Sequence, residues 1–253
     1  MNMLGAKLLL TPTLIGVASI LGRKQGVATA GWFVGLPLTS APVTLFLALE
    51  HGATFASRAA NGTLVGLVSL AGFCLVYGWA AFRLTWLPTM LLGCLAFFLA
   101  TFLLRNVSIG LLPVFLSVII ALATTYALMP VAKDVATAVH LHAWEIPLRM
   151  ISATAVVLLL TSVANILGPH LSGLLTPFPV FAMILAGFTH RFHAPNTTAR
   201  LLRGILLGSF SFAVFFLTVA SVLECVSIVA AFACATAITI TLHGASSLLL
   251  RSI

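Results

Sequence analysis

Two long apolar stretches of the sequence are interrupted by proline and small polar residues, and these interruptions are the features best suited to chemistry. Proline lacks a backbone N–H and its ring clashes with the preceding helical turn, so nearby carbonyls must find other partners. Inside a membrane, such carbonyls and the adjoining helix ends can coordinate an ion or polar solute. Proline also kinks membrane helices simply for packing, and that alternative stays open. The candidate substrate-path residues are Gly35, Pro37, Thr39, Ser40 and Pro42 in one stretch, and Gly173, Thr176, Pro177 and Pro179 in the other.

Charged and imidazole side chains at the ends of apolar stretches form a second group of candidates. An arginine there can bind a phosphate or an anionic substrate, or it can anchor its helix at the lipid headgroups. An adjacent glutamate and histidine can act as a gate or proton acceptor, or can simply cap a helix at the interface. We name six candidate gate or anion contacts: Glu50, His51, Arg58, His193, Arg200 and Arg203.

Patterns typical of metal sites and of catalysis are missing from the sequence. The pairs His140 with His142 and His190 with His193 have no carboxylate or thiol pattern beside them, and the four cysteines lie singly in apolar stretches. No HExxH, nucleotide-binding GxxxxGK[ST] or Ser/His/Asp arrangement occurs. The sequence therefore predicts no metal, no cofactor and no enzymatic activity.

The elements that must position these residues are predicted to be membrane-spanning helices. Only 6% of the 253 residues are charged and 61% are hydrophobic, whereas an average soluble domain has about 25% charged residues. The net charge of +8 does not indicate nucleic acid binding, because the basic residues do not cluster. We predict an all-α polytopic membrane protein with about nine transmembrane helices, near 4–21, 27–49, 60–82, 85–104, 107–129, 147–167, 171–189, 200–221 and 225–246.

The distribution of lysine and arginine between the ends of these helices predicts the orientation. With the N-terminus outside, nine basic residues fall on the cytoplasmic side and three, Lys7, Arg58 and Arg105, fall outside. Because lysine and arginine resist translocation, this predicts an external N-terminus and a cytoplasmic C-terminus.

The sequence also indicates an internal repeat. A shift of 142 residues places Arg58 on Arg200, and the glycines 62 and 66 on 204 and 208, where both pairs have the spacing that lets helices pack closely. Four spans return a chain to its starting face, so one further span before the second copy inverts that copy. We therefore predict two inverted four-helix repeats, 1–105 and 147–253, joined by a central helix and a polar loop in 106–146. Further matches place Lys7 on Arg149, His51 on His193, Gly35 on Gly173 and Pro42 on Pro179.

The second copy resembles a known family. Its run GLLTPFPVFAMILAGFTHR, followed by RLLRGILLGSFSF, is similar to the GlpM-like family of small bacterial inner-membrane proteins, over roughly residues 147–220. In the first copy the corresponding run GLPLTSAPVTLFLALEHG lacks the second closely spaced proline. The resemblance implies a bacterial inner-membrane location and supplies no molecular activity. Two fused, inverted units are also similar in topology, though not in residue patterns, to fused fluoride channels.

These features predict a small transporter or channel for a small neutral or anionic solute, with its path where the repeats meet. A cation is disfavoured because no carboxylate lies deep inside a predicted helix. The alternatives are a non-transporting membrane subunit or scaffold of an envelope pathway, and a lipid-handling protein. Expected partners are the lipid bilayer, a small solute or ion, and a second copy or another membrane subunit, with no nucleic acid.

Overall fold

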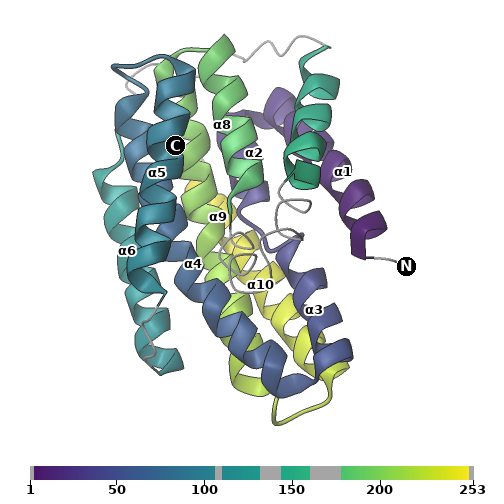
Figure 1. Ribbon diagram of the computed structural model, residues 1–253. Coiled ribbons are helices and arrows are strands. Elements are labelled where there is room, and N and C mark those ends of the chain that lie inside the picture. The colour runs from purple at the N-terminus through teal and green to yellow at the C-terminus, as the bar shows by residue number, and fades with distance from the viewer. Residues whose placement is uncertain (1–2, 106–109, 132–143, 160–177, 251–253) are drawn as a thin grey trace.

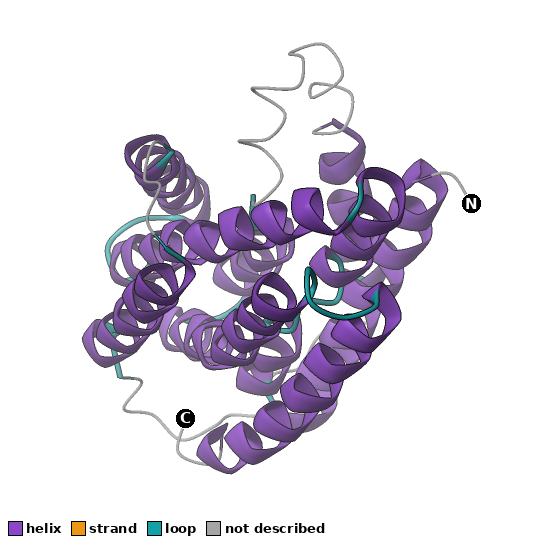
Figure 2. Ribbon diagram, turned by 90° about the horizontal axis from the view of Figure 1, so that it is seen from below, coloured by secondary structure: helices purple, strands orange, loops and turns teal. Residues whose placement is uncertain are grey.

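The computed structural model describes residues 3–105, 110–131, 144–159 and 178–250, and nearly all of them are helical (Figures 1 and 2). No strand occurs within these ranges. The helices are α1 Met3–Gln25, α2 Val27–Val34, α3 Ser40–His51, α4 Ala53–Ala80, α5 Trp86–Leu104, α6 Leu111–Leu128, α8 Val180–Phe192, α9 Pro195–Val222 and α10 Ile228–Leu250. Residues 145–159 are helical as well.

Five of these helices are long and apolar enough to cross a membrane: α4, α5, α6, α9 and Ile228–Ser247 of α10. The outer helices α5, α6 and α10 turn large apolar side chains outward, and Leu95 and Val229 are 62% and 77% exposed. An apolar surface of this extent is suited to lipid rather than water. The chain is therefore a helical protein of the membrane-embedded type, as the composition predicted.

The long helices α4 and α9 pack against each other at the centre of the bundle and run in opposite directions (Figure 1). Near the start of α4, the Ser57 hydroxyl donates a hydrogen bond of 3.0 Å to the carbonyl of Ala220, near the end of α9. At the other end Met129, just after α6, lies against Gly78 of α4 and accepts a hydrogen bond of 3.3 Å from Arg203 of α9. Helix α6 thus packs against both α4 and α9.

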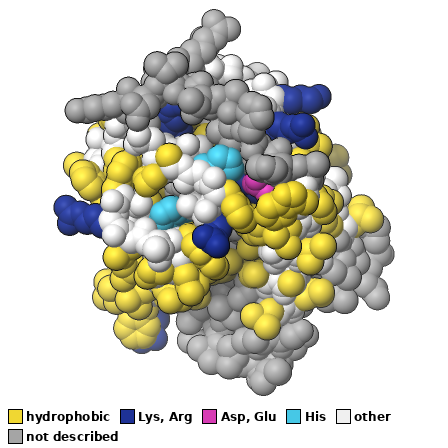
Figure 3. Space-filling model, turned by 90° about the horizontal axis from the view of Figure 1, so that it is seen from above, with side chains coloured by type: hydrophobic (Ala, Val, Ile, Leu, Met, Phe, Trp, Pro, Cys, Tyr) yellow, Lys and Arg dark blue, Asp and Glu magenta, His cyan; other side chains and the backbone are white. Residues whose placement is uncertain are grey.

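Basic residues gather at one end of the bundle, where α4 ends and α9 begins, which we call the basic end. Figure 3 shows this end from above, with histidine side chains and one acidic patch between the basic ones. The other end holds the beginning of α4 and the end of α5, and we call it the distal end. It carries fewer basic residues. Among described residues, the basic end holds Arg23, Lys24, Arg83, Arg149, Arg191, Arg200 and Arg203, and the distal end holds Arg58 and Arg105.

Helix α2 lies directly on α9, backbone against backbone. A Cβ atom built on Gly204 would clash with the Ala28 carbonyl, and one on Gly31 would clash with the Leu201 carbonyl. A Cβ atom on Gly35 would lie 2.6 Å from the Cα of Gly208. The glycine pair 204 and 208 therefore acts as the sequence predicted, by letting two helices approach closely. Gly62 of α4, which the sequence analysis matches to Gly204, has no neighbour within 4 Å of such a Cβ among the described residues.

The α2–α9 contact predicts a difference between two glycines that the sequence repeat treats as equivalent. We expect Gly204→Ala to destabilise the protein by about 1–3 kcal/mol, because its methyl group must displace the backbone of α2. Gly62→Ala meets no neighbour and should be neutral, or stabilising by up to about 1 kcal/mol through helix propensity. Thermal unfolding in detergent measures both, and equal melting temperatures for the two variants would contradict the packing.

Candidate functional site

The stretch predicted as one helix near 27–49 forms two helices, and the break between them lies at the mid-depth of the bundle. Helix α2 ends at Val34 and α3 begins at Ser40. Gly35 faces Gly208, which lies at the middle of the 28-residue helix α9. Proline at position 37 explains the break, because it has no N–H to donate and disfavours the helical conformation of the residue before it.

The backbone groups around the break are largely satisfied locally. The amide of Gly35 donates to the Gly31 carbonyl at 2.9 Å, and the amide of Ala41 donates to the Pro37 carbonyl at 2.9 Å. Gly35 and Pro37 are buried, whereas Thr39, Ser40 and Pro42 are partly buried. The inner side of the break is therefore packed against α9, and its outer side leads into α3.

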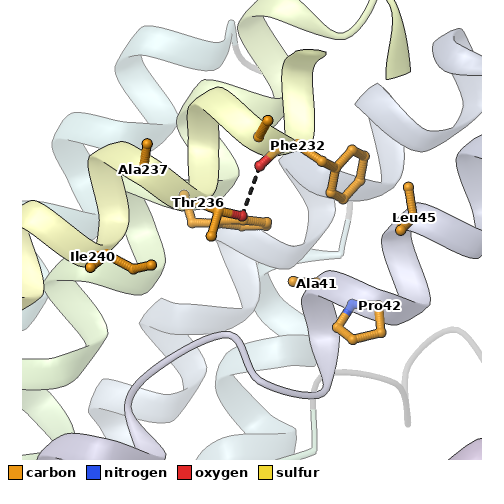
Figure 4. Close-up of a pocket in the computed structure, with 9 residues that line it drawn as sticks. Ala41, Pro42, Leu45, Phe232, Thr236, Ala237 and Ile240 are labelled. Atoms are coloured by element: carbon orange, nitrogen blue, oxygen red, sulfur yellow. Dashed lines mark hydrogen bonds between the residues drawn. The ribbon is translucent and has the colours of Figure 1, made fainter. Parts of the chain in front are cut away.

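Pro42 lines an open groove of about 570 Å³ between α3 and α10 (Figure 4), which Phe215 of α9 also lines. Thr236, the polar residue of the groove, donates its hydroxyl to the Phe232 carbonyl at 2.7 Å. The groove is therefore lined by apolar surface. The remaining lining residues are Ala41, Leu45, Ala233, Ala237 and Ile240.

A polar cluster that the sequence analysis missed lies where α2, α9 and α10 meet. The His243 ring stacks on Trp32 with centroids 3.7 Å apart, and its Nδ1 lies 3.2 Å from the Ser211 hydroxyl. Trp32 Nε1 donates to the Ser246 hydroxyl at 2.9 Å, and Ser246 donates to the His243 carbonyl at 2.8 Å. We call Trp32, Ser211, His243 and Ser246 the Trp32–His243 cluster. Trp32 lies three residues before Gly35, so the cluster adjoins the break.

One atom of this cluster has an unmet hydrogen-bonding requirement. His243 is 5% exposed, and its Nε2 has no hydrogen-bond partner among the described residues. A buried polar group without a partner costs about 1–3 kcal/mol. Ionisable residues inside membrane helices are rare and usually functional. A histidine in the interior of an apolar span is the signal by which the sequence could have pointed to this cluster.

The six candidate gate residues do not meet. Glu50, His51 and Arg58 are exposed at the distal end, whereas His193, Arg200 and Arg203 are partly buried at the basic end. Their two groups are therefore separated by the length of α9.

Arg203 has a defined structural contact. Its Nη1 donates to the carbonyls of Tyr126 and Met129, at 3.2 and 3.3 Å, and its guanidinium lies 4.2 Å from the centre of the Tyr126 ring. These carbonyls end α6, where backbone acceptors have no partner within the helix. The contacts favour anchoring over anion binding for Arg203, which were the two roles that the sequence left open.

The second predicted break is only partly described. Pro179 directly precedes α8. Gly173, Thr176 and Pro177 lie outside the described residues.

The basic end contains a buried ion pair that the sequence analysis had divided between a loop and a helix start. Arg149 Nη2 lies 3.2 Å from Glu145 Oε2, and the side chains are 4% and 1% exposed. The Arg149 guanidinium lies 5.6 Å from the centre of the Phe188 ring of α8. Nearby, the Tyr77 hydroxyl of α4 contacts His190 Nδ1 of α8 at 3.5 Å. The pair and this contact tie together the helices at the basic end.

Metal ligands do not gather in the described part of the chain, where no group of three His, Cys, Asp or Glu side chains could hold an ion. All four cysteines are free. No known family model, curated protein or solved structure matches the chain. The resemblance to the GlpM-like family therefore stays a prediction.

The unmet requirement of His243 predicts an uncommon result for a core substitution. We expect His243→Phe to change the melting temperature in detergent little, because removing the unpartnered Nε2 offsets the loss of the contact between Nδ1 and the Ser211 hydroxyl, while phenylalanine keeps the stacking on Trp32. Trp32→Ala should instead lower the stability by about 3–5 kcal/mol, because it leaves a cavity between three helices. A His243→Phe variant as unstable as Trp32→Ala would show that the imidazole is a structural hydrogen-bonding group.

Proposed function

We propose that this protein is a small transporter or channel for a small neutral or anionic solute, with its path beside the broken second span. The observation that carries the proposal is the position of the break, at mid-depth and next to the buried His243. Transport sites commonly lie near the bilayer midplane, where interrupted helices and polar side chains replace water around the solute. A protein that only needed packing could carry an apolar residue at position 243 with little change in stability.

The absence of deep carboxylates supports a neutral or anionic solute. Of the described acidic residues, Glu50 and Glu224 lie at the distal end and Glu145 lies at the basic end, where it pairs with Arg149. The described mid-depth region therefore offers a cation no carboxylate to balance its charge.

Two features of the helices support the proposed inverted repeat. The 12-residue α3 and the 13-residue α8 each lead into a helix of 28 residues, α4 and α9. Those two long helices carry the matched arginines 58 and 200 and run antiparallel, as equivalent helices of inverted copies must. On this basis the units are 1–105 and 147–253, and α6 belongs to the connecting segment 106–146.

A matched pair of polar contacts supports the same repeat independently. The Thr101 hydroxyl of α5 donates to the Ser69 hydroxyl of α4 at 2.9 Å. A shift of 142 residues carries Ser69 onto Ser211 and Thr101 onto His243, which are also in contact, at 3.2 Å. Each half thus carries one polar contact between equivalent helices, and we include both contacts in the proposed path.

A second candidate function is a non-transporting membrane subunit, acting as a scaffold in an envelope pathway. The close packing of Gly35 on Gly208 favours it, because backbone atoms fill the inner side of the break. Absence of flux, together with recovery of one partner in a fixed ratio after cross-linking in native membranes, would support this function over transport.

The basic end should face the cytoplasm, because seven described basic residues lie there and two lie at the distal end. The bacterial inner membrane as the location rests on the resemblance to the GlpM-like family. A phosphatase or fluorescent reporter fused after residue 253 tests the orientation. We expect fluorescence without phosphatase activity, and phosphatase activity would reverse the assignment.

Flux through proteoliposomes tests the transport proposal directly. Suitable probes are chloride, nitrate, acetate, urea and glycerol, each followed with the purified protein. We expect one of them to pass, and His243→Phe or Ser69→Ala to slow it about tenfold, which corresponds to about 1.4 kcal/mol.

Thr241→Ala is the matched control for these flux measurements, because Thr241 is exposed on the same helix as His243 and bonds only to carbonyls of its own helix. It should leave flux unchanged. Equal flux in all variants would remove the two polar contacts from the path.

A further inference from the structure

The groove between α3 and α10 is separate from the Trp32–His243 cluster, and its chemistry differs. We propose that it binds one acyl chain of an ethanolamine phospholipid from the leaflet at the distal end. Four observations support this occupant: the lining of the groove, its length and depth, its continuity with the lipid-exposed surface, and the charges beyond its distal end.

The lining selects hydrocarbon. Eight of the nine lining residues are alanine, proline, leucine, isoleucine or phenylalanine. The ninth, Thr236, has its hydroxyl hydrogen already engaged by the Phe232 carbonyl (Figure 4). A polar solute would lose its bonds to water here without gaining a donor, whereas an acyl chain loses nothing.

The length of the groove matches one leaflet. Its wall on α10 runs from Phe232 to Ile240, a rise of about 12 Å at about 1.5 Å per residue. It begins one helical turn after the start of α10 at the distal end and stops near the middle of that helix. Half of a hydrocarbon core is about 15 Å thick, so the groove has the reach and depth of an acyl chain from that leaflet.

The groove is also continuous with the lipid-exposed surface of the bundle. Ile240, at its mid-depth limit, is 64% exposed, and Leu49, near the distal end of α3, is 62% exposed. An acyl chain can therefore enter sideways from the bilayer without crossing a polar barrier.

A carboxylate lies at the distal end of each of the two helices that form the groove. Glu50 lies in the last turn of α3, and Glu224 lies in the turn that leads from α9 into α10. Figure 1 shows the end of α3 and this turn together at the distal end. Both side chains are exposed. The exposed Arg58 also lies at the distal end, so this end carries both signs of charge. A zwitterionic headgroup, as in phosphatidylethanolamine, complements it with an ammonium for the carboxylates and a phosphate for the arginine, whereas phosphatidylglycerol has no ammonium.

Native mass spectrometry of the full chain, extracted from vesicles of equal phosphatidylethanolamine and phosphatidylglycerol, tests the proposal. We expect the wild-type protein to keep one phosphatidylethanolamine through detergent exchange. Ala237→Trp fills the groove and should lower the lipid-bound fraction at least fivefold. Ile238→Trp is the matched control, because Ile238 is exposed on the same helix but lies on the opposite side from the groove-lining residues, and it should bind lipid as the wild type does.

Three results would overturn the proposal: no retained lipid on the wild-type protein, equal retention by the two tryptophan variants, or a preference for phosphatidylglycerol. Ala233→Trp fills the same groove from an exposed position. It replaces Ala237→Trp if that variant does not elute as a folded monodisperse species.

Discussion

The backbone contact between α2 and α9 is the constraint on which the candidate site depends. In a bilayer the hydrophobic effect does not drive helices together, so close packing of small residues must do so. Glycines 31, 35, 204 and 208 let the two backbones touch at the points where these glycines lie. Helix α2 is thereby held at a fixed depth against α9, which places the Gly35 break at mid-depth and brings Trp32 against a histidine 211 positions later in the chain.

The same bilayer constraint explains where the remaining polar groups lie. Most charged side chains of the described residues are at the two ends of the helices, and those that are buried have partners. Arg203 satisfies carbonyls at the end of α6, and Arg149 pairs with Glu145. A buried polar group in hydrocarbon cannot hydrogen-bond to water, so leaving it without a protein partner carries a free-energy cost. His243 Nε2 shares this lack of a partner with the buried hydroxyls of Ser19, Thr89, Thr198 and Thr239 among the described residues, but of these five groups it alone belongs to an ionisable ring. The six residues chosen from sequence for gating or anion contacts lie instead at the two ends of the helices, where charged groups reach water.

The sequence predicted those features that depend on local chemistry. Apolar length identified the long helices, Pro37 identified the break in the second stretch, and glycine spacing identified the close packing of α9. It did not predict the Trp32–His243 cluster, because that contact requires knowing which face of α10 meets α2. For the same reason it placed Pro42 among path residues without indicating that this proline lines an open apolar groove. The sequence also could not predict that Glu145 and Arg149 are buried, because an i, i+4 ion pair has the same sequence pattern on an exposed helix.

The contrast between the two proposed repeats bears on how such a protein would work. Ser69 with Thr101 and Ser211 with His243 occupy matching positions, but only the second contact includes an ionisable ring. Likewise Gly204 is pressed against α2, while its match Gly62 meets no described neighbour. A duplicated bundle that kept two identical sites would bind a solute equally at both. Divergence at matched positions instead leaves one hydroxyl pair and one hydroxyl–imidazole pair. Under the transport proposal, a solute moving past the central α4–α9 pair would then meet two different sets of hydrogen-bonding groups.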